Sequence, residues 1–97
     1  MNHALLAEKS IATEEKQLIE RFVNSLWLES GLSENTRRSY QSDLYLCAEW
    51  LANKQVKLCV ADRQSILSFL AYKIKAGCKP RTTARILSSL KRYYQFL

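Results

Sequence analysis

Apolar residues recur at three- and four-residue spacing in four stretches of the chain, and each stretch predicts an amphipathic helix. The predicted helices run from residue 13 to about 30, from 33 to about 53, from 63 to about 76, and from 80 to 97. Residues 54–61 are expected to form a connection with an extended piece at Val56–Val60. Two glycines and one proline are too few for a turn-rich β fold. We therefore expect one all-α domain of four helices joined by short loops.

Helix ends are marked by side chains with known capping preferences. Three residues with short oxygen-bearing side chains are predicted to cap the first three helices: Thr13, Ser33 and Asp62. Gly31 and Gly77 are expected to end the first and third helices, because glycine readily adopts the left-handed conformation found there. Pro80 suits the first turn of the last helix, where its missing N–H would be unpaired anyway. Residues 1–12 show weak periodicity, and we expect this extension to be flexible.

The apolar stripes define the expected core. Its members are Leu18, Ile19, Phe22, Val23 and Leu26; Tyr40, Leu44, Cys47 and Leu51; Ile66, Leu67, Leu70 and Ile74; and Ile86, Leu87, Leu90, Tyr93, Tyr94 and Leu97. Phe69 is placed at the margin of the third stripe. The fourth stripe runs to the last residue with no stop signal, and Phe96 falls near its polar side. We expect the natural chain to continue beyond Leu97.

The polar side of the last helix carries a row of basic residues. Arg81, Arg85, Ser88 and Arg92 recur at spacings of four, three and four, which places them within a sector of roughly 60° opposite the apolar stripe. Residues 79–97 contain five Lys and Arg and no acid. A solvated helix face usually mixes both signs of charge. A row of arginines with small hydroxyls between them suits a helix that lies against DNA.

The charge is distributed unevenly along the chain. The net charge of +6 divides into −3 for residues 1–49 and +9 for residues 50–97, where Asp62 is the only acid. This asymmetry predicts a polyanionic partner, with nucleic acid first and an anionic membrane surface second. The sequence predicts no membrane span and no signal peptide, so we expect a cytoplasmic protein.

The start of the second predicted helix also departs from local rules. Arg37 and Arg38 lie in its first turn, where the helix dipole favours acids. Such a departure either marks a functional position or reflects two ordinary surface arginines.

Chemistry typical of enzymes is missing from the sequence. It contains one histidine, His3, and no Ser-His or Cys-His arrangement, paired carboxylates or phosphate loop. Asp43 lies beside the apolar stripe, and we expect it to pair with a basic group at the core margin. Cys47, Cys59 and Cys78 match neither a disulfide framework nor a zinc site. We predict no catalysis by this chain alone, no cofactor and no metal.

Three segments carry a resemblance to a known family. Residues 32–44 (LSENTRRSYQSDL) combine a capped turn, Thr36, Tyr40 and the pair Asp43–Leu44. Together with residues 18–32 (LIERFVNSLWLESGL) and 83–97 (TARILSSLKRYYQFL), they resemble the N-terminal core-binding, or SAM-like, domain of tyrosine recombinases and phage integrases of the Xer type. The resemblance covers about residues 15–97.

This resemblance implies a fold, a function and partners. It implies a four-helix orthogonal bundle of the SAM-like type over residues 13–97, which clamps one face of a double-stranded DNA half-site during recombination or integration. A separate C-terminal catalytic domain, absent from this chain, would close round the other face and cleave the strand. Recombinase subunits would assemble as a tetramer on DNA. The implied DNA-binding residues are Thr36, Arg37, Arg38, Ser39, Arg81, Thr82 and Arg85, with Ser88 and Arg92.

Two alternatives remain at this stage. The chain can be a helical protein-interaction module that docks through Trp27, Tyr45 and Phe96. It can also be a complete small helix-turn-helix regulator that dimerises on palindromic DNA.

Overall fold

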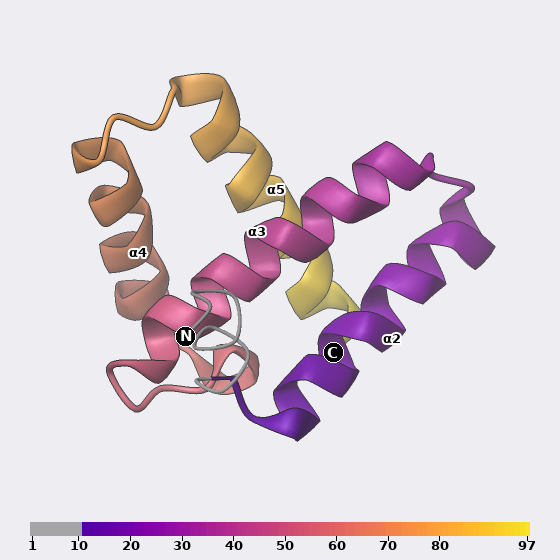
Figure 1. The fold of residues 1–97 in the computed structure, drawn as a ribbon, viewed down its shortest axis with the longest axis horizontal. Coiled ribbons are helices and arrows are strands. Elements are labelled where there is room, and N and C mark those ends of the chain that lie inside the picture. The colour runs from indigo at the N-terminus through magenta and orange to yellow at the C-terminus, as the bar shows by residue number, and fades with distance from the viewer. Residues whose placement is uncertain (1–10) are drawn as a thin grey trace, which may run out of the picture.

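Four α-helices and one short 3-10 helix form the described part of the chain, which in this computed structural model is residues 11–97 apart from the side chain of Ser30. They are α2 (Thr13–Ser30), α3 (Glu34–Ala52), η1 (Leu58–Val60), α4 (Arg63–Lys75) and α5 (Pro80–Phe96) (Figure 1). No strand occurs in this part of the chain, so the predicted all-α class is confirmed.

The predicted flexible extension, residues 1–12, falls mostly outside the described residues. Of its members, Ile11 and Ala12 are described. Ile11 is partly buried and packs against the core.

Most predicted helix ends are confirmed. The Ser33 hydroxyl accepts a hydrogen bond from the Thr36 N–H at 3.2 Å, as expected for an N-cap. Gly31 has φ of 60°, and its N–H donates to the Trp27 carbonyl at 3.2 Å, which ends α2 in a left-handed cap. Pro80 lies in the first turn of α5. The α2–α3 and α4–α5 junctions are therefore fixed by local sequence.

Two local predictions are wrong. Thr13 does not cap α2; the N-cap is Ala12, whose backbone is extended and whose carbonyl accepts from the Lys16 N–H at 3.0 Å. The predicted extended piece at Val56–Val60 instead contains the 3-10 helix η1. This turn brings Leu58 into the core, where it is fully buried. Burial of one apolar side chain thus outweighs the local β propensity of the valines.

Helix α3 is the centre of the arrangement. It contacts α2, α4, α5 and η1. Figure 1 shows α2 running beside α3. Helix α5 crosses α3 at a steep angle, and α4 lies next to the C-terminal end of α3. No helix of the described residues is long and apolar enough to cross a membrane.

The core forms where these helices meet. Its centre consists of fully buried side chains from α2, α3, η1 and α5: Ile19, Leu44, Cys47, Leu51, Leu58 and Tyr93. Phe22 packs edge-on against Tyr93 with ring centroids 5.4 Å apart. The prediction that Leu87 and Leu97 belong to the core is wrong, because they are 37% and 50% exposed.

The buried side of α4 also differs from the prediction. Phe69 is a core residue, 2% exposed, whereas Leu67 and Ile74 are 51% and 59% exposed. The ring centroid of Phe69 lies 5.6 Å from that of Trp50 on α3. Because Phe69 packs against Trp50, the face of α4 that carries Ile66, Phe69 and Leu70 is directed into the core.

Candidate nucleic-acid interface

Helix α5 has one buried face and one basic face. Ile86, Leu90 and Tyr93 are at most 2% exposed on the inner face. The outer face carries the predicted row, in which every member is exposed: Arg81, Arg85, Ser88 and Arg92. Thr82 is partly buried beside this row. The amphipathic pattern predicted from spacing is therefore present in the folded helix.

Arg85 pairs with Asp43 of α3. Arg85 Nε and Nη2 donate to Asp43 Oδ2 and Oδ1 at 3.0 and 2.8 Å. These hydrogen bonds raise the pKa of Arg85, so its guanidinium stays charged. The expectation that Asp43 pairs with a basic group at the core margin is confirmed. The partner, however, is one of the residues assigned to DNA.

Arg92 lies against a ring of α3. Its guanidinium carbon is 6.0 Å from the ring centroid of Tyr40, within the range of a cation–π contact. Tyr40 was predicted only as a core residue. Spacing along one helix cannot reveal such a contact, because it joins residues 52 positions apart.

The first two turns of α3 hold the second group of predicted residues. Arg38 Nη2 donates to Glu34 Oε1 at 2.8 Å, and both side chains are well exposed. The Arg37 guanidinium carbon lies 4.6 Å from the ring centroid of Trp27 on α2. Thr36 and Ser39 are partly buried. The two arginines are thus held by neighbouring side chains and still reach the surface.

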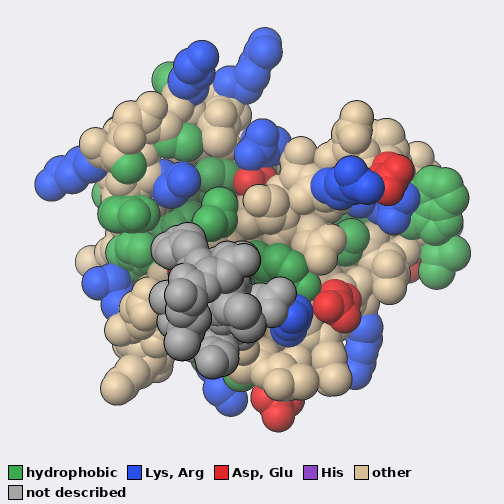
Figure 2. All heavy atoms as spheres, viewed as in Figure 1, with side chains coloured by type: hydrophobic (Ala, Val, Ile, Leu, Met, Phe, Trp, Pro, Cys, Tyr) green, Lys and Arg blue, Asp and Glu red, His purple; other side chains and the backbone are tan. Residues whose placement is uncertain are grey.

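The structure does not gather all nine residues into one cluster. The first turn of α3 and the first turn of α5 lie at separate ends of the crossed pair (Figure 1). Arg85 and Arg92 lie between them, where α5 contacts Asp43 and Tyr40 of α3. Figure 2 shows Lys and Arg side chains over both ends, with few acids among them. The predicted residues therefore form an extended basic surface across two helices, suited to a long polyanion.

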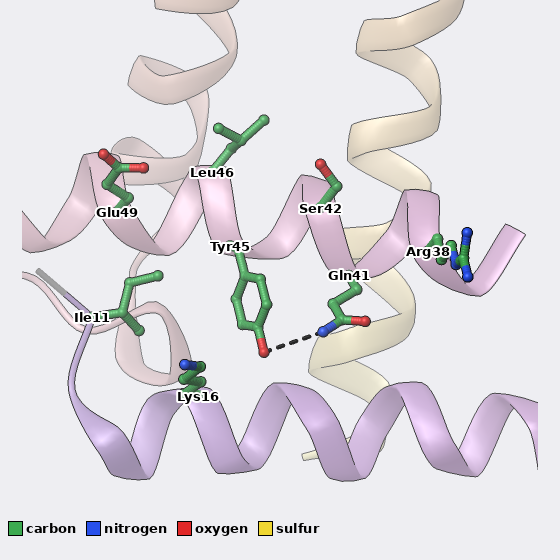
Figure 3. A pocket seen from close by; sticks show the side chains of 8 residues that line it. All are labelled: Ile11, Lys16, Arg38, Gln41, Ser42, Tyr45, Leu46 and Glu49. Carbon is green, nitrogen blue, oxygen red and sulfur yellow. Dashed lines mark hydrogen bonds between the residues drawn. The ribbon is translucent and has the colours of Figure 1, made fainter. Parts of the chain in front are cut away.

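A groove of about 350 Å³ lies between α2 and α3 (Figure 3). Of the predicted site residues it includes only Arg38. Within α3, Gln41 Nε2 donates to the Tyr45 hydroxyl at 3.3 Å, and this hydroxyl donates to Glu20 Oε1 of α2 at 3.4 Å. The second of these hydrogen bonds joins α2 to α3.

The three aromatic residues of the protein-docking alternative each have a partner inside the fold. Trp27 stacks on Arg37, and Tyr45 bonds to Gln41. Phe96 packs on Phe22 with ring centroids 5.6 Å apart. Trp27 and Phe96 are nevertheless 54% and 40% exposed.

Comparison with known sequences adds independent information. The family described as "Phage integrase, N-terminal SAM-like domain" matches residues 19–97. Tyrosine recombinase XerD of Pseudomonas putida is 50% identical over 80 residues, which cover 82% of this chain and 27% of that protein. Its counterpart in Pseudomonas aeruginosa is 42% identical over 86 residues, covering 89% and 29%.

Tyrosine recombinase XerD of Yersinia pestis is 42% identical over 84 residues, which cover 87% of this chain and 28% of the relative. The chain therefore spans less than a third of the length of these relatives. No solved structure gives a significant match.

Proposed function

The chain belongs to the phage integrase N-terminal SAM-like domain family, and from this premise we propose that it binds double-stranded DNA through the outer face of α5 and the first two turns of α3. The observation that carries the proposal is the row of exposed basic residues on α5. This row has no acid within its helix, and the neighbouring carboxylate of Asp43 is turned inward and 3% exposed. Such a basic face attracts the phosphates of DNA.

The proposed contacts fall into two groups. On α5 they are Arg81, Thr82, Arg85, Ser88 and Arg92; on α3 they are Thr36, Arg37, Arg38 and Ser39. Lys and Arg contacts to phosphates supply most of the affinity and make it strongly dependent on salt. Hydroxyls between them allow close approach of the helix backbone. Arg38 or Arg85 can also donate to a guanine edge, a contact worth roughly 1–3 kcal/mol of discrimination.

The role within a longer protein follows from the relatives' names. We propose that this domain holds one face of a recombination half-site in a cytoplasmic, site-specific tyrosine recombinase, whose strand cleavage is carried out by a further domain. Subunits would then assemble as a tetramer on DNA. In that arrangement this domain contributes binding and orientation, and the catalytic groups lie elsewhere.

Binding to random-sequence duplex DNA at several salt concentrations tests the proposal. We expect the logarithm of the association constant to fall steeply with the logarithm of salt, by about 0.9 for each phosphate contact. A variant in which Arg81, Arg85 and Arg92 are replaced by alanine should lose most of the affinity and of this slope. Wild-type protein that fails to bind at low salt, or a folded variant that binds equally well, would overturn it.

A further inference from the structure

We propose that Asp43 is a positioning residue, which fixes the guanidinium of Arg85 so that its outer edge meets a DNA phosphate. This inference rests on the proposed function, because it assigns a role to a residue behind the same surface. It runs against the simplest electrostatic expectation, since a carboxylate near DNA normally weakens binding.

The contact between the two side chains restricts rotation of the guanidinium. Both oxygens of Asp43 are engaged by Arg85, at 3.0 Å from Nε and 2.8 Å from Nη2. Two parallel hydrogen bonds fix the plane of a guanidinium as well as its position. The Ser89 hydroxyl lies 3.4 Å from Oδ2 of the same carboxylate and is itself fully buried. The Ser89 hydroxyl is closer to the Ile86 carbonyl, at 2.9 Å, so Asp43 is enclosed on the core side by burial while it bonds Arg85.

The exposure of the pair is unequal. The Asp43 side chain is 3% exposed, whereas that of Arg85 is 45% exposed. A guanidinium carries five N–H donors. The Nε–H and one N–H of Nη2 point to Asp43, which leaves the second Nη2 donor and both Nη1 donors for an outside acceptor. These remaining N–H donors lie in the plane of a charged group, and a phosphate can accept two hydrogen bonds from them.

Fixing this side chain before binding has a physical advantage. A free arginine on a helix surface samples many rotamers and loses that freedom when it contacts DNA. Arg85 has already lost it in the folded protein. The positive charge at this point of α5 is thereby placed between those of Arg81 and Arg92, one helical turn or two away.

The direction of the effect on DNA affinity distinguishes positioning from a purely electrostatic role. Asp43→Asn removes one negative charge and keeps the shape of the side chain, but its amide group opposes one of the two Arg85 donors. If Asp43 matters only through its charge, this variant binds DNA more tightly. If Asp43 positions Arg85, we expect affinity to fall about three- to tenfold as one charge-assisted contact loosens.

Glu34→Gln is the matched control. Like Asp43→Asn, it removes one carboxylate that bonds an arginine of the proposed interface, here Arg38, whose Nη2 lies 2.8 Å from Glu34 Oε1. In this pair, however, both side chains are exposed. Exposed pairs of this kind hold their partners weakly. We expect equal or tighter DNA binding by this variant. A double-mutant cycle completes the design, since Asp43→Asn should have no unfavourable effect in an Arg85→Gln background.

Affinities are compared at one salt concentration for variants whose circular dichroism shows them folded. Arg85→Lys provides a second route, because it keeps the charge and loses the planar fork; positioning predicts weaker binding despite the unchanged charge. Asp43→Asn and Arg85→Lys proteins that both bind as tightly as wild type would overturn the inference. That result leaves the proposed function standing, whereas wild-type protein with no salt-dependent binding removes the proposed function itself.

Discussion

The guanidinium of Arg37, in the first turn of α3, lies over the ring of Trp27 near the end of α2, with 4.6 Å between the guanidinium carbon and the ring centroid. Positive charge in a first turn is disfavoured by the helix dipole. The negative face of the indole ring compensates for this, because it attracts a cation placed above it. The contact also spans the two helices on either side of the Gly31 turn.

We predict that Trp27 and Arg37 are energetically coupled. Urea unfolding of Trp27→Ala, Arg37→Ala and the double variant should give a coupling free energy of about 0.5–1 kcal/mol, as cation–π contacts do at partly exposed sites. Trp27→Phe should retain part of this coupling because it keeps an aromatic face. Additive single effects would mean that the two side chains are neighbours without a stabilising contact.

The neighbouring tyrosines of α5 are expected to respond oppositely to loss of a hydroxyl. The Tyr94 hydroxyl donates to the Leu58 carbonyl at 2.7 Å, whereas the buried Tyr93 hydroxyl has no hydrogen-bond partner among the described residues. Tyr94→Phe should therefore lower the free energy of unfolding by about 0.5–1.5 kcal/mol. Tyr93→Phe should leave it unchanged or raise it, because it removes a buried polar group that gains nothing from folding. Equal losses in urea unfolding would point to a buried water on Tyr93.

The N-cap of α4 predicts a pH-dependent contribution to stability. The Asp62 carboxylate accepts from the Ser65 N–H at 2.8 Å, and this hydrogen bond lowers the pKa of Asp62. Because the folded pKa is the lower one, the charged carboxylate stabilises the fold above its unfolded pKa of about 3.9. That contribution is lost as the pH falls through the folded pKa.

Asp62→Ala should accordingly be less stable than wild type at neutral pH, with a difference that shrinks as the pH falls below about 4. Thermal unfolding across this range measures the effect. Asp62→Asn is the control, because an asparagine caps a helix without titrating. A wild-type to Asp62→Ala difference that stays constant down to the lowest pH would contradict the prediction.

The Cys47 thiol should be inert in the folded protein. Burial raises its pKa to about 12, with a smaller contribution from the charge of Glu15. The thiolate is the reactive species, so both its scarcity and its burial slow modification. In a Cys59→Ser/Cys78→Ser protein, we expect a thiol reagent at pH 8 to react with Cys47 only as fast as the chain unfolds, and rapidly in urea. Fast reaction under native conditions would mean that the core opens locally.

Sequence reasoning predicted the helices well because their signals are local. Ser33, Gly31 and Pro80 act through their own backbone neighbourhood, and the structure confirms each. The resemblance to Xer-type domains is likewise confirmed by the family match over residues 19–97 and by the identity with XerD tyrosine recombinases. The errors on α4 have a different origin. The sequence of α4 fits two equally plausible inner faces, one containing Leu67 and one containing Phe69. Only contact with Trp50 of α3 selects the face that contains Phe69.

The candidate site shows the same division. The basic row on α5 was predictable, since spacing along one helix defines a face. Asp43 was expected to pair with a basic group, but which side chain each arginine contacts was not predictable, because the partners come from other helices. Arg85 with Asp43, Arg92 with Tyr40 and Arg37 with Trp27 join residues that only tertiary packing brings together. Sequence thus predicted which positive charges lie at the surface, but not which side chains orient them.

The separation of the two basic ends leads to a prediction about DNA binding. Because the first turns of α3 and α5 lie apart (Figure 1), Arg38 and Arg81 should contact different phosphates. Arg38→Ala and Arg81→Ala should each reduce the salt slope by about 0.9. Their losses of binding free energy should add within about 0.3–0.5 kcal/mol, as for independent sites. Lys57→Ala, which removes an exposed charge between α3 and η1, should leave the slope unchanged. A double variant no weaker than the worse single variant would mean that DNA contacts only one of the two ends, and the interface would then have to be confined to a single helix.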